Sequence, residues 1–191
     1  MSNGLTLKYR RILLKVSGEF FSGEHESIDP DRVAMLARNI AELVSLGVQV
    51  SIVLGAGNLC RGQTFAQAGF DQVAADHIGM MATVMNALAL KDVLRQQNIT
   101  SVVRSAFDIA GITPVFCRDE ALEQLNTGKV LICAGGTGNP LVTTDSAAAL
   151  RAIELNVDVL LKATKVEGVY SADPFKDKNA QLFSEITYQE V

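Results

Sequence analysis

Short apolar runs that alternate with longer amphipathic segments are the feature of this sequence that most limits its fold. The strand-like runs occupy residues 11–18, 48–55, 101–106, 129–136 and 157–164. The helix-like segments occupy residues 29–46, 71–96, 118–126 and 144–155. Strands that alternate with helices form a parallel sheet that is covered on both faces. The sequence therefore predicts an α/β fold, a three-layer αβα sandwich with a mainly parallel central sheet.

Local signals predict how some of these elements begin and end. Asp29 is suited to cap the helix at 29–46, with Pro30 as its first residue and Gly47 after its end. Around Gly168, Val and Tyr alternate with polar residues, which predicts a hairpin or an irregular excursion. Residues 182–191 predict the beginning of a further helix.

Composition argues against several classes of protein. Hydrophobic residues make up 48% of the 191 residues, enough for a sizeable core in one large domain or two small ones. There is no run of about 18 apolar residues, so we expect no membrane span and no membrane partner. The N-terminus lacks the long apolar region of a secretory signal. A net charge of −4, no basic run and 6% aromatic residues predict no nucleic-acid partner.

The cysteines indicate a reducing compartment. Cys60, Cys117 and Cys133 are odd in number and far apart, and no CxxC pair or Cys/His cluster occurs. This spacing predicts neither a disulfide framework nor a structural zinc site. We expect small buried or half-buried side chains in a cytoplasmic protein.

Residues that suit an anion follow the first strand-like run. Ligands of open parallel sheets bind beyond the carboxyl ends of the strands, so these loops are the informative ones. Lys15 lies inside an apolar run and is followed by Ser17 and Gly18. A buried lysine is costly without a partner. The strand is therefore either a solvated edge strand, or it directs the ammonium group into an anion site.

The second run ends in the loop GAGNLCRG, residues 55–62. Glycines let backbone N–H groups approach an anion closely, and the guanidinium of Arg61 matches phosphate oxygens. The loop fits neither the dinucleotide fingerprint nor the P-loop motif. An ordinary turn between strand and helix remains the alternative interpretation.

The fourth run ends in a loop rich in glycine and threonine. Its glycines and hydroxyls precede a helix that begins near Asp145; they are Gly135, Gly136, Gly138, Thr137, Thr143 and Thr144. One interpretation is a helix cap made by Thr144 or Asp145. That explains one residue, whereas a helix N-terminus reached through a polar loop is also suited to an anion. We expect Asp145 to orient a lysine or a hydroxyl rather than to bind phosphate.

Further polar residues lie at the start of the long helix and after the last strand. Asp76 either complements the helix dipole or accepts hydrogen bonds from a sugar. We expect His77 to be packed and hydrogen-bonded, and His25 to be a solvated loop residue. The last strand leads into Lys162, Thr164, Lys165, Tyr170 and Asp173. The aromatic ring and the acid could stack a base and hold a ribose, and an exposed tyrosine on a turn is the alternative.

Taken together, these groups predict phosphoryl transfer. Glycine amides, cations and one carboxylate at a single sheet edge suit a reaction that depends on positioning and charge neutralisation. The sequence contains no GxSxG motif and no histidine beside a candidate cysteine or serine. Acyl transfer by a nucleophile and base is therefore not indicated.

Five motifs occur in the order of a known enzyme family. They are RILLKVSGE, GAGNLCRG, DHIGMMATVMNALAL, GGTGNPLVTTDSAA and LLKATKVEGVYSADP. From about Arg11 to its last residue, the chain resembles the bacterial uridylate kinases, the UMP kinases of the amino acid kinase superfamily. The resemblance implies transfer from ATP to UMP in pyrimidine nucleotide biosynthesis, with Mg²⁺ bound through the ATP phosphates. It also implies a homohexamer, with GTP as an activator and UTP as an inhibitor.

The resemblance assigns roles to particular residues. Catalysis would rest on Lys15, Arg61 and Asp145. The ATP site would be formed by Lys15, Val16, Ser17, Gly18, Gly57, Arg61, Thr164, Tyr170 and Asp173. The UMP site would be formed by Ala56, Asp76, Thr137, Gly138, Asn139, Pro140, Leu141, Val142, Thr143 and Thr144. No residue is assigned as a metal ligand.

The chain departs from the family pattern at three places. Ala56 replaces the middle glycine of the usual GGGN loop, and the segment at 20–29, linked by resemblance to GTP activation, is short. Family members continue beyond the equivalent of Val191. We therefore expect 1–191 to be a single amino acid kinase-like domain that holds the UMP-binding part and the start of the ATP-binding part. The alternatives are a relative that phosphorylates a carboxylate or carbamate, or a non-catalytic nucleotide-binding regulator.

Overall fold

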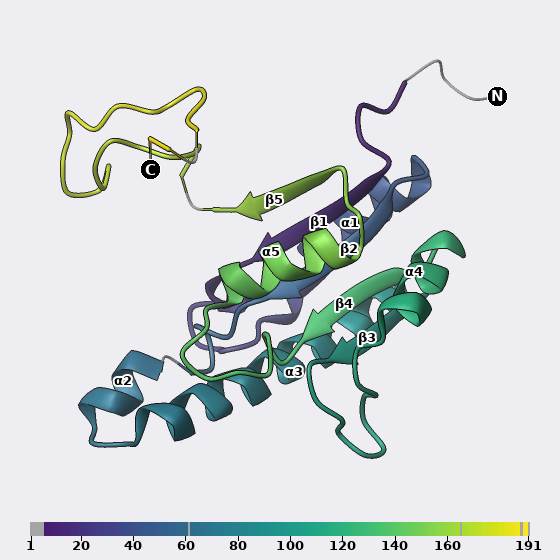
Figure 1. The fold of residues 1–191 in the computed structure, drawn as a ribbon, viewed down its shortest axis with the longest axis horizontal. Helices are drawn as coiled ribbons and strands as arrows, with labels where there is room; N and C mark the ends of the chain where they lie inside the picture. Colours follow the sequence, from purple (N-terminus) through teal and green to yellow (C-terminus); the bar gives the residue numbers. More distant parts are fainter. Residues whose placement is uncertain (1–5, 61, 165, 188, 191) are drawn as a thin grey trace.

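A computed structural model describes residues 6–60, 62–164, 166–187 and 189–190. Five parallel strands form one sheet in the order β3-β4-β2-β1-β5 (Figure 1). The strands are β1 (Arg11–Val16), β2 (Gln49–Leu54), β3 (Ser101–Ser105), β4 (Val130–Ala134) and β5 (Val159–Ala163). The predicted α/β fold is therefore confirmed, and within these residues the named strands pair only in parallel.

Helices cover both faces of the sheet. The helical elements are η1 (Gly18–Phe21), α1 (Pro30–Ser45), α2 (Gly62–Gln67), α3 (Gln72–Gln96), α4 (Arg118–Asn126) and α5 (Thr144–Glu154). Side chains of α1 and α3 share one core with the sheet, and side chains of α4 and α5 share a second core with it. Figure 1 shows α5 lying across the sheet on the side opposite α1. These are the three layers that the alternating pattern predicted.

At α1 and α5, a side chain at the start of the helix accepts hydrogen bonds from free N–H groups. In α1, the Asp29 carboxylate accepts hydrogen bonds from the N–H groups of Asp31 and Arg32, as its predicted cap role requires. At α5 the cap is Thr143, whose hydroxyl accepts from the N–H of Ser146 at 3.2 Å. The expectation of a cap at Thr144 or Asp145 is therefore wrong, and the Asp145 side chain is left for other partners.

The long helix α3 is apolar because it lies in the core. Its length and composition are those of a possible membrane span, which the sequence analysis did not expect. However, 44% of its most apolar window is buried inside this fold, and Leu90 and Leu94 are fully buried. One face of α3 is therefore packed in the core of this fold. His77, near its start, is exposed, so its predicted packed role is wrong, whereas His25 is exposed as expected.

The segment after β5 follows an irregular path. Tyr170 forms an isolated antiparallel bridge with Leu182, and the N–H of Phe183 donates to the carbonyl of Val169. This agrees with the irregular excursion expected around Gly168. Residues 182–187 are not helical, so the helix expected there is wrong within the described residues. Leu182 and Phe183 pair instead with Tyr170 and Val169. The short helix α2 was not predicted.

Candidate active site

The loops after β1 and β2 pack backbone against backbone. A Cβ atom on Gly18 would lie 2.4 Å from the backbone nitrogen of Gly57, and one on Gly55 would lie 2.9 Å from that of Gly18. A side chain at either position would displace the facing loop, so glycine is required there for close approach. The two loops therefore meet at the carboxyl edge of the sheet.

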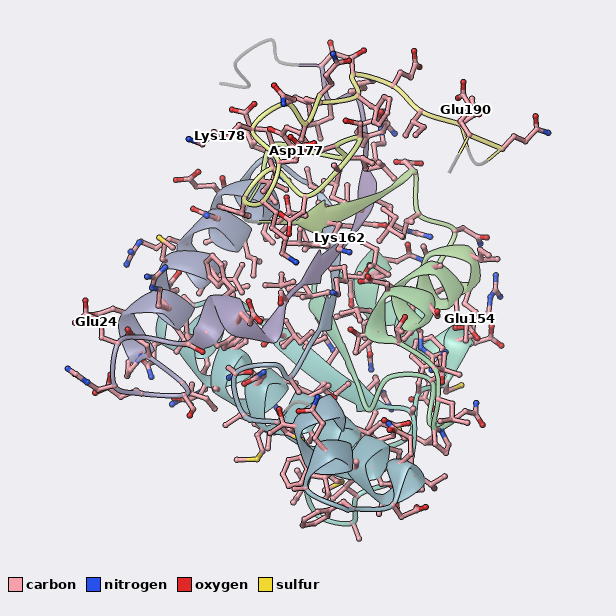
Figure 2. The ribbon with its side chains drawn as sticks, turned by 90° about the vertical axis from the view of Figure 1, so that its left-hand side faces the viewer. Glu24, Glu154, Lys162, Asp177, Lys178 and Glu190 are labelled. Carbon is pink, nitrogen blue, oxygen red and sulfur yellow. The ribbon has the colours of Figure 1, made fainter. Side chains whose placement is uncertain are left out.

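A carboxylate with two lysines lies at the centre of this edge. Lys15 Nζ is 2.7 Å from one oxygen of Asp145, and Lys162 Nζ is 2.8 Å from the other. The two lysines are paired in register on β1 and β5, where Figure 2 labels Lys162. Because β1 lies between β2 and β5, the alternative of Lys15 on a solvated edge strand is wrong. Lys15 is only 9% exposed, and its charge is matched by Asp145.

The environment keeps Asp145 ionised. Partial burial alone would raise its pKa, but hydrogen bonds and charge from Lys15 and Lys162 outweigh burial, so the pKa lies below its ordinary value. Two positive charges therefore face one negative charge, and the cluster is net positive. A net positive cluster with one half-exposed lysine is suited to attract an anion.

A first cleft, of about 170 Å³, lies on the α3 side of this cluster. It is bounded by α3 and by the loops after β2 and β4, through Ala56, Cys60, Ala75, Asp76, Gly79, Met80, Thr83, Gly136, Asn139, Val142 and Thr144. Five of the residues predicted for UMP are among these lining residues: Ala56, Asp76, Asn139, Val142 and Thr144. Burial raises the pKa of the Cys60 thiol, which keeps it protonated at neutral pH.

Asp76 holds the wall of this cleft together. One of its oxygens accepts from the backbone N–H of Leu141 at 2.7 Å, and the other accepts from Gln72 Nε2 at 2.9 Å. Leu141 has a φ of 64°, a left-handed conformation that is unusual for a leucine. The carboxylate thus holds the loop after β4 against α3. An ionised carboxylate can accept more than two hydrogen bonds, so Asp76 can also accept from a ligand in the cleft that it lines.

The loop after β4 is shaped by its glycines and threonines. Gly135 and Gly138 have φ values of 75° and 80°, and a Cβ on Gly135 would lie 2.8 Å from Ser105 Oγ. Thr137 Oγ1 accepts from the N–H of Asn139 at 3.2 Å. The remaining predicted positions, Pro140 and Thr143, continue this loop to the cap of α5.

A second cleft, of about 780 Å³, lies on the β5 side of the cluster. Its lining residues are Lys15, Ser17, Glu19, Phe20, Arg32, Lys162, Ala163, Thr164, Val166, Asp173, Pro174 and Phe175. Lys15, Ser17, Thr164 and Asp173 are the residues among these that were predicted for ATP. The Thr164 hydroxyl donates to the carbonyl of Val166, which fixes the start of the loop after β5.

Other predicted ATP residues lie differently. Val16 is buried in the core, and its carbonyl accepts from the N–H of Gly55, so only its backbone reaches the sheet edge. Tyr170 lies outside the described lining of the second cleft and is paired with Leu182. Arg61, predicted for catalysis, lies outside the described residues.

Sequence reasoning missed part of the first cleft. Met80 and Thr83 line it from α3, one and two turns after Asp76. The spacing of these residues, i, i+4 and i+7, places them on one helix face. That spacing was available in the sequence once Asp76 was singled out. Lys162 was noted without a role, because its pairing with Lys15 depends on strand register over a long sequence separation.

The fold and the two clefts define a class of protein, an α/β phosphotransferase with a cationic cluster between two clefts. The chain belongs to the amino acid kinase family, whose model matches residues 10–191. It is 53% identical over 190 residues to a uridylate kinase of Pseudomonas syringae, and the aligned region covers 99% of this chain and 77% of that protein. It is 54% identical over 185 residues to a uridylate kinase of Pseudomonas aeruginosa, with 96% and 76% covered.

Solved structures agree with this placement. A UMP kinase from Bacillus anthracis superposes with a TM-score of 0.87 at 37% identity, covering 91% of this chain and 72% of that one. A UMP kinase from Ureaplasma parvum superposes with a TM-score of 0.89 at 34% identity, covering 96% and 78%. The amino acid kinase-like fold that the resemblance implied is therefore confirmed.

Proposed function

We propose that this chain transfers the γ-phosphoryl group of ATP to UMP, giving UDP and ADP, as a step of pyrimidine nucleotide biosynthesis. The observation that carries the proposal is the cluster of Lys15, Asp145 and Lys162 at the junction of two clefts. Thr144, next to Asp145, lines the first cleft, and both lysines line the second. The names of the relatives support UMP as the acceptor, and the family resemblance supplies ATP as the donor.

UMP is assigned to the first cleft. The lining of this cleft suits a nucleotide, with Asp76 accepting from the ribose hydroxyls. Ala56 and the loop from Thr137 through Gly138, Asn139, Pro140, Leu141, Val142 and Thr143 to Thr144 surround the base and the phosphate. A loop rich in backbone N–H groups that ends at a helix N-terminus supports binding of a phosphate.

ATP is assigned to the second cleft. Lys15, Ser17 and Gly18 contact its phosphates, with the backbone of Val16 and of Gly57 beside them. The adenosine lies against Thr164 and Asp173, and Tyr170 closes on it from the loop after β5. By the family resemblance, Arg61 is assigned to bind phosphate. The larger volume of this cleft supports a nucleoside triphosphate there.

The transfer is direct and in line. A UMP phosphate oxygen forms a bond to the γ-phosphorus while the bond to the β–γ bridging oxygen breaks, and ADP leaves with that electron pair. A phosphate monoester has a second pKa of about 6, so its nucleophilic oxygen is largely ionised at pH 7 and needs no base. Asp145 therefore holds the lysines, because both of its oxygens accept from ammonium groups. Lys15, Lys162 and Arg61 offset the repulsion between the phosphates.

Mg²⁺ is assigned to the ATP phosphates. The Asp145 carboxylate is occupied by two lysines, and the described residues contain no group of three His, Cys, Asp or Glu side chains suited to hold a metal ion. This donor set fits a cation that arrives bound to the nucleotide. When bound, Mg²⁺ supplies charge neutralisation on the phosphates.

The finer properties of the family extend the proposal. We assign 1–191 to one domain in the cytoplasm, assembled as a homohexamer, activated by GTP and inhibited by UTP. Self-association is supported by an apolar strip on the outer face of α3, formed by Ile78, Met81 and Met85, which are 38%, 47% and 53% exposed. An exposed apolar strip of this kind is typical of an interaction surface.

A coupled assay of the purified protein tests the proposal. With ATP and Mg²⁺, we expect ADP formation with UMP and slower turnover with CMP and dUMP. A thermal-shift series compares UMP with acetylglutamate and carbamate, because a ligand at a hundredfold excess over its Kd stabilises the folded state by about 2.7 kcal/mol. Stabilisation by an amino acid derivative but not by UMP would overturn the substrate assignment. UMP binding without turnover would favour a regulator.

A further inference from the structure

Helix α3 directs two buried polar side chains at the two glycine-rich loops. Thr83 is 2% exposed and Asn86 is 0% exposed, although most of their buried neighbours on α3 are apolar. The two residues are three apart, so they lie side by side on one face of the helix. Burial of a polar group is costly unless the group is hydrogen-bonded. The partners of these two side chains therefore indicate what they do.

Thr83 holds the start of the loop after β4. Its Oγ1 accepts from the backbone N–H of Gly135 at 2.8 Å and donates to the carbonyl of Met80 at 2.7 Å. Gly135 is the first residue beyond β4, and its left-handed backbone is crowded by Ser105. The Thr83 hydroxyl thus fixes the point at which the loop that bounds the first cleft leaves the sheet.

Asn86 holds the loop after β2. Its Nδ2 donates to the carbonyl of Gly55 and to Asn58 Oδ1, both at 2.8 Å, while Asn58 Nδ2 donates back to Asn86 Oδ1 at 2.9 Å. Asn58 also donates to the carbonyl of Ser27 at 2.7 Å. Both amide groups have their N–H groups engaged by protein atoms. Gly55 packs against Gly18, so Asn86 also fixes the position of the loop after β1.

We propose that Thr83 and Asn86 are positioning residues, through which α3 fixes the two glycine-rich loops relative to each other. Thr83 sets the loop that bounds the UMP cleft, and Asn86 sets the loops that lie between the two clefts. The assignment of substrates to the clefts rests on the proposed function. The hydrogen-bonding role of the two side chains does not.

The Thr83 pair of variants tests the proposal. Thr83→Val keeps the shape but leaves the buried Gly135 N–H without its acceptor, whereas Thr83→Ser keeps the hydroxyl. We expect Thr83→Val to raise the KM for UMP about tenfold, the factor that matches one buried hydrogen bond left unmade, with the KM for ATP changed less than about twofold. Thr83→Ser should restore the parental KM for UMP.

The Asn86→Leu variant tests the second loop. Removal of the amide breaks the bonds that tie the Gly55 carbonyl and Asn58 to α3, while Asn58 keeps its bond to the Ser27 carbonyl. We therefore expect the KM values for both nucleotides to rise and kcat to fall. An effect confined to one nucleotide would contradict the assignment of Asn86.

Ser51→Ala separates positioning from stability. Ser51 is 0% exposed, and its hydroxyl donates to the carbonyl of Ile12 at 2.8 Å inside the sheet, away from both clefts. This variant loses a buried hydrogen bond of the same kind. We expect a lowered melting temperature with parental KM values. If a general loss of stability controlled binding, KM would rise in both Ser51→Ala and Thr83→Val.

Amide hydrogen exchange gives a readout that needs no activity. In the ligand-free protein, peptides covering residues 135–143 should exchange faster in Thr83→Val than in the parent, Thr83→Ser or Ser51→Ala. If the parent fails to phosphorylate UMP, the proposed function fails, and the exchange result decides this inference alone. Parental exchange in Thr83→Val, or equal defects in Thr83→Ser and Thr83→Val, would overturn it.

Discussion

Lys15 combines two properties that rarely occur together in one side chain. It is almost fully buried in a central strand, and it carries a positive charge whose match is the half-exposed carboxylate of Asp145. Burial removes water that would compete for an incoming anion, so interactions of the ammonium group are stronger there than in solution. The same burial makes Lys15 dependent on Asp145.

Replacement of Lys15 separates catalysis from binding. Since Lys15 faces the ATP cleft and the first cleft has its own lining, we expect Lys15→Ala to lower kcat by about 10² or more while UMP binding stays nearly parental. Steady-state kinetics and UMP-dependent thermal shift measure the two effects. Lys91→Ala, an exposed lysine on α3, is the charge-matched control. Parental turnover in Lys15→Ala would refute its catalytic role.

Asp145 predicts a particular pH dependence of stability. Its folded-state pKa lies below the ordinary value of 3.8, so ionised Asp145 stabilises the fold above that pH, and this contribution is lost as the pH falls through the folded-state pKa. The difference in unfolding free energy between parent and Asp145→Asn should therefore be present at pH 7 and shrink below pH 3.8. Urea unfolding at several pH values measures it.

Asp158 supplies the comparison. Hydrogen bonds from the backbone N–H groups of Arg11 and Arg10 lower its pKa as well, but it lies at the opposite end of the sheet. Asp158→Asn should show the same direction of pH dependence with unchanged phosphoryl transfer, whereas Asp145→Asn should lose transfer. Equal activities in the two variants would refute the organising role of Asp145.

At the scale of elements, α5 is both a covering helix and part of the site. Its cap residue Thr143 ends the glycine-rich loop, and its next two residues are Thr144 in the first cleft and Asp145 on the lysines. The start of α5 therefore determines where both side chains lie. The cap of α1, Asp29, has no such neighbour in the lining of the first cleft, whereas Arg32, whose N–H it caps, lines the second.

The two caps make a matched pair of variants. Loss of a helix cap costs about 1 kcal/mol, so Thr143→Ala and Asp29→Ala should lower the unfolding free energy by similar amounts. Only Thr143→Ala should also raise the KM for UMP, because the start of α5 shifts. Chemical denaturation and kinetics on both proteins test this. A raised KM in Asp29→Ala as well would mean that stability alone controls binding.

For the whole molecule, the alternating pattern was enough to predict the layers, because each strand and helix must bury an apolar face. The motif residues around Lys15, Gly57 and Asp145 could also be identified, since their chemistry is local. The strand order could not, because it depends on which edges pair in three dimensions. The Asp76 bond to Leu141 and the lysine pair across β1 and β5 are likewise long-range contacts.

Local propensity also misled in two places. Residues 182–187 have a helical pattern, but Leu182 and Phe183 pair with Tyr170 and Val169. At α5, three candidate caps follow one another, and Thr143 is the one whose hydroxyl reaches the free N–H of Ser146. In both cases the deciding factor was the position of the chain relative to its neighbours.

The register between β1 and β5 has a consequence for sequence change. Residues paired across parallel strands point to the same side, so Lys15 and Lys162 share a side only while residue 12 faces residue 159. Adding or removing one residue in the turn between α5 and β5 would send the second ammonium group to the opposite side of the sheet. A change in the length of that turn would therefore leave Asp145 with a single cation.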